Sequence, residues 1–288
     1  MKMWKRLFAM ILTLAMALSL SACGSFEARV ARAAKKLQST KSMHMDMSVS
    51  FDIALSMLGQ ELGIDFDMDV ESDMFMDPLQ AKMIMTMNSM GESSSILSYA
   101  EKNDESYTLY VSADDGTTWQ KRSVDVSELP AQLNASNAMD QLSLFIESAQ
   151  SFQEVGTEQI NGSDAVRYDG TLKGEAVAKA MELSGILDTF SSQFGGELDL
   201  SAFDDSSIPA SIWIDTKSGY IVRYDLDMTE IMGQVLKTML SSTMESAGLA
   251  DMSELVNGVE LNNCLASVVL SQFNAVEPFQ IPEEAREA

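Results

Sequence analysis

The chain has 288 residues, 46% of them hydrophobic, and its 43 acidic and 19 basic side chains give a net charge of −24. A surface this acidic repels phosphate groups, so nucleic acid and other acidic polymers are disfavoured as partners. The length and hydrophobic content allow a substantial core, in one large domain or two small ones.

Residues 1–22 have the three parts of a secretory signal peptide. A basic start containing Lys2, Lys5 and Arg6 is followed by the apolar stretch 7–18 and by small residues that lead to Cys23. The apolar stretch is short for a bilayer span, so we expect removal of this segment rather than retention as a membrane helix. Loss of its three cations would lower the net charge to −27.

The segment Leu20-Ser-Ala-Cys23 resembles the lipobox of bacterial lipoproteins, whose cysteine is acylated after cleavage. The resemblance implies a lipid such as palmitate on Cys23, which would hold the protein on the outer face of the cell membrane. The alternative is an ordinary secreted protein in which Cys23 happens to follow the cleavage site. Lipid on Cys23 would leave Cys264 without an intramolecular partner, and the apolar run around Cys264 predicts a buried, inert thiol.

Residues 23–41 contain the predicted lipidated N-terminus and an amphipathic helix whose polar face is mostly basic. This helix either packs on the domain or contacts anionic lipid head groups. From Ser42 onward, alternating apolar and polar residues predict long half-buried strands, and Asp115-Gly116 and Asn161-Gly162 predict hairpin turns. The predicted strands are 43–57, 64–71, 79–87, 96–101, 107–112, 118–123, 152–160, 165–172, 210–215, 220–227 and 259–273; the predicted helices are 127–150, 174–194 and 229–246, with an exposed loop at 195–207.

These elements predict one α+β domain over residues 42–276, followed by a C-terminal tail at 277–288. Catalytic motifs are missing from the sequence: the single histidine, His44, lies on the polar side of a strand, and no nucleophile elbow, zinc spacing or phosphate-binding loop is present. The carboxylates between Asp65 and Glu71 alternate along a strand about 7 Å apart, unlike a calcium loop. The sequence therefore predicts neither an enzyme nor a cofactor or metal site.

Methionine is the unusual component of this sequence. Of 22 methionines, 11 fall between Met43 and Met90, mostly on the apolar faces of three consecutive predicted strands. They either fill an ordinary core or line an adaptable apolar cavity for acyl chains, because the thioether side chain is flexible and polarizable. A soft-metal site at Met83 and Met85 is disfavoured, because sulfurs two positions apart on a strand are widely separated and no histidine or cysteine lies among them.

Two hairpin segments, Gln159-Ile-Asn-Gly-Ser-Asp-Ala-Val-Arg-Tyr168 and Trp213-Ile-Asp-Thr-Lys-Ser-Gly-Tyr-Ile-Val-Arg223, resemble the LolA/LppX-like family, and in particular its uncharacterised membrane-anchored Gram-positive lipoproteins. The order of elements, from lipobox to final strand, agrees. The resemblance implies about eleven antiparallel strands in a curved half-barrel, with helices over the concave face and a lipid-binding cavity between them. The implied lining is Met45, Met47, Phe51, Phe66, Met68, Met83 and Met85 from the sheet and Phe145, Ile186, Val235 and Met239 from the helices.

Two functions remain open at this point. One is a membrane-anchored extracytoplasmic lipoprotein that binds a lipid or other amphiphile in an apolar, methionine-rich cavity. The other is a non-enzymatic cell-surface interaction or sensor module with a fully packed core.

Overall fold

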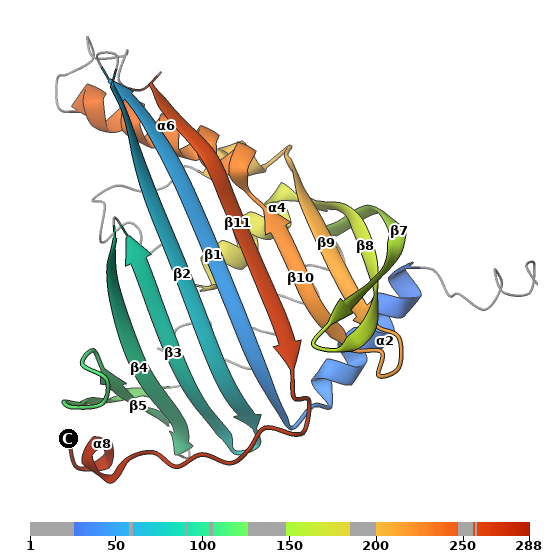
Figure 1. Ribbon diagram of the computed structural model, residues 1–288, viewed down its shortest axis with the longest axis vertical. Coiled ribbons are helices and arrows are strands. Elements are labelled where there is room, and N and C mark those ends of the chain that lie inside the picture. Colours follow the sequence, from blue (N-terminus) through green and yellow to red (C-terminus); the bar gives the residue numbers. More distant parts are fainter. Residues whose placement is uncertain are drawn as a thin grey trace, which may run out of the picture.

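One antiparallel sheet of eleven strands organises the computed structural model (Figure 1), which describes residues 26–57, 60–89, 91–103, 106–125, 148–184, 200–246, 256 and 258–288. The strand order is β6-β5-β4-β3-β2-β1-β11-β10-β9-β8-β7, so the last strand pairs with the first and joins two meanders. The strands are β1 Ser42–Met57, β2 Gln60–Met76, β3 Leu79–Ser89, β4 Glu92–Asn103, β5 Ser106–Ser112, β6 Gln120–Asp125, β7 Ala149–Ile160, β8 Ser163–Lys173, β9 Ser207–Asp215, β10 Ile221–Asp227 and β11 Val259–Ser271. The predicted α+β class, with about eleven antiparallel strands, is confirmed.

The described helices are α2 Phe26–Gln38, α4 Gly174–Ser184, α6 Thr229–Ser246 and α8 Glu283–Glu287, with a short 3₁₀ helix, η3, at Leu200–Phe203. Helix α6 has the predicted bounds. The helix predicted over 127–150 is wrong at its end, because Ala149 already pairs with Leu172 as part of β7; residues 127–147 lie outside the described residues. The loop predicted over 195–207 contains η3, whose Phe203 is fully buried, and its last residue begins β9.

Tight turns occur where the sequence predicted them. Asn161 and Gly162 have φ values of 50° and 76°, and Asp115 and Gly116 have 53° and 85°. Positive φ at both central residues matches the right-handed twist of the flanking strands, which is why Asn-Gly and Asp-Gly favour hairpins.

Helices α2, α4 and α6 all lie on one side of the sheet, behind it in Figure 1. Val30 and Ala33 of α2 pack against Val166 and Ile212. A second cluster joins α4, η3 and α6 to β8 and β9 through residues that include Leu172, Val177, Phe203, Ile208, Ile231 and Val235. These two core clusters therefore lie between the helices and the half of the sheet formed by β7–β11.

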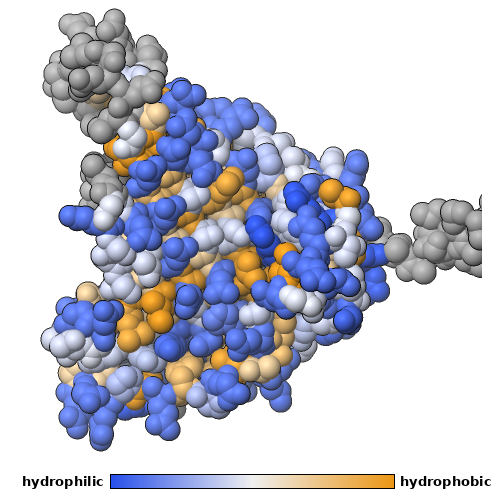
Figure 2. Space-filling view, viewed as in Figure 1, coloured by the Kyte–Doolittle hydropathy of each residue, from blue (hydrophilic) through white to orange (hydrophobic). Residues whose placement is uncertain are grey.

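The opposite side of the sheet is more polar, and Figure 2 shows hydrophilic side chains there with hydrophobic patches between them. The C-terminal segment, including the predicted tail 277–288, leaves the sheet but packs onto this side near β4–β6 (Figure 1). Phe279 contacts Phe75 and Tyr99, with ring centroids 5.8 and 5.9 Å apart. The Arg286 guanidinium donates two hydrogen bonds, of 2.9 and 3.0 Å, to the Glu101 carboxylate.

Candidate functional site

The apolar side of β1–β3 carries a surface that we call the methionine face. Directly paired residues of neighbouring strands share one side of a sheet. Met47 is opposite Val70, Val70 is opposite Met85, and Met68 is opposite Met87. Among the side chains that the structure describes, this register gives nine methionines on one side: Met43, Met45, Met47, Met68, Met74, Met76, Met83, Met85 and Met87.

The predicted sheet residues all lie on this face. Met45, Met47, Met68, Met83 and Met85 belong to the nine. Phe51 and Phe66 face each other on the same side, with ring centroids 6.1 Å apart. The register thus brings together all seven residues proposed from the sheet.

The methionine face is uncharged and half-buried. Among the described side chains, no charged residue lies on this side of β1–β3, while the other side of β2 carries Asp65, Asp67 and Asp69. All nine methionines are half-buried, whereas Val70 and Ala81 on the same side are buried. The arrangement provides flexible apolar side chains over a well-packed sheet surface.

The predicted helix residues are placed differently. Val235 is only 2% exposed and belongs to the closed cluster over β8 and β9, not to the methionine face. Met239 is half-buried on the same helix, α6, which packs on β11. Phe145 and Ile186 lie outside the described residues. Among the described helices, α2, α4 and α6 make their main sheet contacts with β7–β11.

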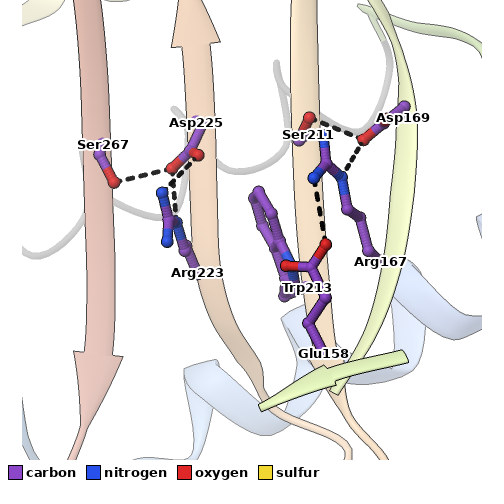
Figure 3. Close-up of polar contacts among 8 residues, drawn as sticks. All are labelled: Glu158, Arg167, Asp169, Ser211, Trp213, Arg223, Asp225 and Ser267. Carbon is purple, nitrogen blue, oxygen red and sulfur yellow. Dashed lines mark hydrogen bonds and ion pairs between the residues drawn. The ribbon is translucent and has the colours of Figure 1, made fainter. Parts of the chain in front are cut away.

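A second feature, on the opposite side of the sheet, was not predicted. We call it the polar ladder; it crosses β7–β11 (Figure 3) and consists of Glu158, Arg167, Asp169, Ser211, Trp213, Arg223, Asp225 and Ser267. At its centre the Trp213 ring lies between the guanidinium groups of Arg167 and Arg223, whose central carbons are 5.0 and 4.8 Å from the ring centroid. The signal that could have revealed it is the sequence Arg-Tyr-Asp, which occurs twice, at Arg167–Asp169 and Arg223–Asp225, where the two hairpin segments end.

Hydrogen bonds connect the ladder from strand to strand. The Trp213 indole donates to Glu158 at 2.8 Å, and Arg167 donates to Asp169 at 2.7 Å and to Glu158 at 3.1 Å. The hydrogen bonds from Trp213 and Arg167 lower the pKa of Glu158. For Asp169, burial raises the pKa, but hydrogen bonds from Arg167 and Ser211 outweigh this effect and lower it. These carboxylates are therefore held in the ionised form as parts of a cross-link between strands.

An open trough of about 440 Å³ lies beside the ladder, lined by residues that include Ser48, Ser211, Asp225, Leu265 and Ser267.

Further along this side of the sheet, the His44 ring nitrogens lie 2.7 Å from Asp73 and 3.0 Å from Asp46. Burial lowers the pKa of His44, but the two carboxylates together raise it above its usual value. His44 is thus half-buried and paired rather than simply solvated. Among the described residues, no three His, Cys, Asp or Glu side chains form a group that could hold a metal ion.

Comparison with known proteins identifies the family. A family described as "Family of unknown function (DUF6612)" matches residues 26–194, more than half of the chain. The chain belongs to this family. The DUF6612 match includes α2 and β1–β8, and so contains the whole methionine face, but of the ladder it includes only Glu158, Arg167 and Asp169.

Solved structures similar to this DUF6612 member include two mycobacterial proteins. LppX of Mycobacterium tuberculosis, described as a lipoprotein, is 16% identical over 89% of this chain and 97% of its own, with a TM-score of 0.45. LprF of Mycobacterium bovis is 15% identical over 90% and 96%, with a TM-score of 0.47. A LolA superfamily protein of Nitrosomonas europaea is 9% identical over 91% and 97%, with a TM-score of 0.23. No curated protein matches the chain.

The structural neighbours thus include LppX and a LolA superfamily protein, the two names in the sequence resemblance. The α+β fold assignment itself rests on the strand order and pairing of this DUF6612 chain.

Of the two cysteines of this chain, Cys23 lies outside the described residues. Cys264 is fully buried, as predicted, and burial raises the pKa of its thiol to about 12. None of the described helices is long and apolar enough to cross a bilayer.

Proposed function

We propose that this protein is a membrane-anchored extracytoplasmic lipoprotein that binds a lipid or other amphiphile on its methionine face. The observation that carries the proposal is the uncharged surface of nine half-buried methionines on β1–β3, outside the main contacts of the described helices. Proteins seldom leave a large apolar surface without a role, and such surfaces commonly bind ligands, membranes or partners.

The chemistry of the methionine face suits acyl chains. Each methylene moved from water to an apolar surface contributes about 0.8 kcal/mol before entropy costs. From Met43 to Phe51 the face extends along eight residue steps of β1, or about 26 Å at strand spacing, compared with about 15 Å for the acyl region of one bilayer leaflet. Flexible thioethers can adjust to chains of different shape. A selective fit to one rigid molecule would instead favour stiff β-branched residues.

The anchor in this proposal is lipid on Cys23. It is supported by the basic start, the apolar stretch and the lipobox-like residues 20–23. The burial of Cys264 adds support, because a fully buried thiol does not offer a disulfide partner to Cys23. A tethered protein of this kind acts as a carrier or sensor beside the bilayer and not as a catalyst.

Acylation can be tested by metabolic labelling with an alkyne analogue of palmitate. We expect the wild-type precursor and the control Cys264→Ala to become labelled and to fractionate with membranes. The variant Cys23→Ala should remain unlabelled. Label on Cys23→Ala, or an unlabelled wild-type protein in a host that acylates other lipoproteins, would contradict the anchor.

A second function, an interaction or sensor module with a fully packed core, is favoured by the cluster over β8 and β9. There Phe203 is fully buried and Val235 and Ile208 are each 2% exposed, so this half of the molecule is closed to a ligand. The two functions differ in what they require of β1–β3: an open binding surface in the first, and a sealed core in the second.

Fluorescent fatty acid uptake by a soluble chain of residues 24–288 separates the two. We expect Met45→Trp and Met85→Trp to weaken uptake about tenfold, because the indole occupies surface that an acyl chain would otherwise cover. The matched control is Thr86→Trp, next to Met85 on the same strand but on the opposite side of the sheet; its uptake should equal that of the wild type. Equal uptake by all three variants would exclude the methionine face as the binding surface.

A further inference from the structure

The basic residues of this acidic protein are concentrated at one end. Residues 23–41 contain five Lys or Arg and one acidic residue, whereas residues 42–288 contain 11 basic and 42 acidic ones. Four of the five cations, Arg29, Arg32, Lys35 and Lys36, lie on helix α2. The local charge of this helix is thus opposite in sign to that of the rest of the protein.

Helix α2 presents Arg32 and Lys35 away from the sheet, while Arg29 and Lys36 lie at the edge of its basic side and reach back to Tyr168 and Ser218. Val30 and Ala33 are buried against β8 and β9, which fixes the inner side of the helix. At about 100° per residue, the four cations occupy an arc of roughly 120° centred on the outer side, and Glu27 lies outside that arc. The amphipathic helix therefore packs on the domain with its inner side and leaves its basic side outward.

The cations of α2 are not neutralised by the described residues. Arg32, Lys35 and Lys36 are exposed, and the ion pairs within the described part of the chain include none of the four. Arg29 donates to the Tyr168 hydroxyl at 2.6 Å, and Lys36 donates to the Ser218 carbonyl. Both partners are uncharged, so they orient these side chains without cancelling their charge.

We infer that the outer side of α2 is a docking surface for the anionic head groups of a lipid bilayer. Basic residues near such a surface contribute about 1 kcal/mol each, and the attraction extends over one Debye length, about 8–10 Å. Three residue steps separate Phe26 from Cys23, a reach of at most about 11 Å. The position of the helix at the membrane rests on the proposed anchor, which would hold these cations within the range of the head-group charge.

Docking would also orient the proposed ligand surface. Met47 of the methionine face and Ile212 under α2 belong to one cross-strand row, because Met47 pairs with Val268, Val268 with Tyr224, and Tyr224 with Ile212. The methionine face and α2 therefore lie on the same side of the sheet. Contact of α2 with the head groups turns this side toward the bilayer and the acidic side of β2 away from it.

Vesicle sedimentation of the unacylated chain, residues 24–288, tests the docking surface without the anchor. The vesicles contain equal amounts of phosphatidylglycerol and phosphatidylcholine, or phosphatidylcholine alone. We expect binding only to the anionic vesicles, decreasing steeply between 20 and 300 mM NaCl. The variant Arg32→Gln/Lys35→Gln should bind about 25-fold more weakly, given about fivefold for each charge.

The control Lys82→Gln/Lys121→Gln removes two cations from the opposite side of the sheet, where both belong to the cross-strand row of Asp73, and should bind as the wild type does. An equal loss of vesicle binding in both double variants would show a general effect of charge and overturn the proposal. Equal binding to both vesicle types, or no binding to the anionic vesicles at 20 mM NaCl, would also overturn it. Because the chain in this assay carries no lipid and is given no fatty acid, failure here is separate from failure of acylation or of ligand binding.

Discussion

The division between a closed core and a half-buried methionine face predicts that two apolar truncations will have opposite consequences. Ile231 on α6 is 3% exposed and lies in the cluster over β8 and β9. Ile231→Ala removes buried carbon atoms and leaves a cavity, which together cost about 2–5 kcal/mol of unfolding free energy. Met85 is half-buried on a face outside the main helix contacts. Met85→Ala therefore loses only part of the free energy of transferring a methionine side chain from water, and it leaves no closed cavity. The unfolding free energy should fall by about 1 kcal/mol.

Urea denaturation of the unacylated chain, stripped of bound lipid, measures these costs from the shift in midpoint at constant slope. Fatty acid affinity should change in the reverse order: Ile231→Ala binds as the wild type does, and Met85→Ala binds about fivefold more weakly, the equivalent of about 1 kcal/mol of lost contact. A stability loss of several kcal/mol for lipid-free Met85→Ala would show that the methionine face is sealed core. The reasoning for a ligand surface would then fail.

Three further predictions concern the polar side of the sheet. Trp213→Leu removes the ring between the two guanidinium groups and the hydrogen-bond donor to Glu158. It should lower the unfolding free energy, measured by urea denaturation, by about 2–4 kcal/mol. An unchanged unfolding free energy would mean that the ladder does not cross-link the strands. Arg286→Ala removes the bidentate partner of Glu101, whose side chain is 12% exposed, and should cost about 1–3 kcal/mol by thermal unfolding, with unchanged melting as the contrary result. The pKa of His44 is raised in the folded protein, so the stabilising contribution of its protonated ring is fully present below pH 6.5 and is lost as the pH rises through the folded pKa. The difference in unfolding free energy between the wild type and His44→Gln should therefore narrow across that range. A difference that widens would mean that folding lowers the pKa of His44.

Local patterns predicted most of the fold. Alternation along β1 fixed which side of the strand is apolar, and the register then placed Met45 and Met85 on one face because directly paired residues share a side. Asn161-Gly162 predicted its hairpin from two residues that tolerate positive φ. These features depend on neighbours in sequence or on strand period, so they can be read without knowledge of the tertiary structure.

Features that depend on distant pairing could not be read in this way. The polar ladder requires Arg167 and Arg223 to meet Trp213 from two different strands, and only the strand order brings them together. The packing of the C-terminal segment depends on Glu101, which is 185 residues from Arg286. Val235 was expected over the methionine face because the period of a helix identifies its buried side but not the strands on which that side packs.

Native mass spectrometry of the unacylated chain, purified from cells without detergent, tests the central claim most directly. The account predicts a population with a bound lipid or fatty acid mass, which is released on activation and is strongly reduced in the variant Met45→Trp/Met85→Trp. Only ligand-free protein, together with no uptake of added fatty acid by the correctly folded wild-type chain, would contradict the account.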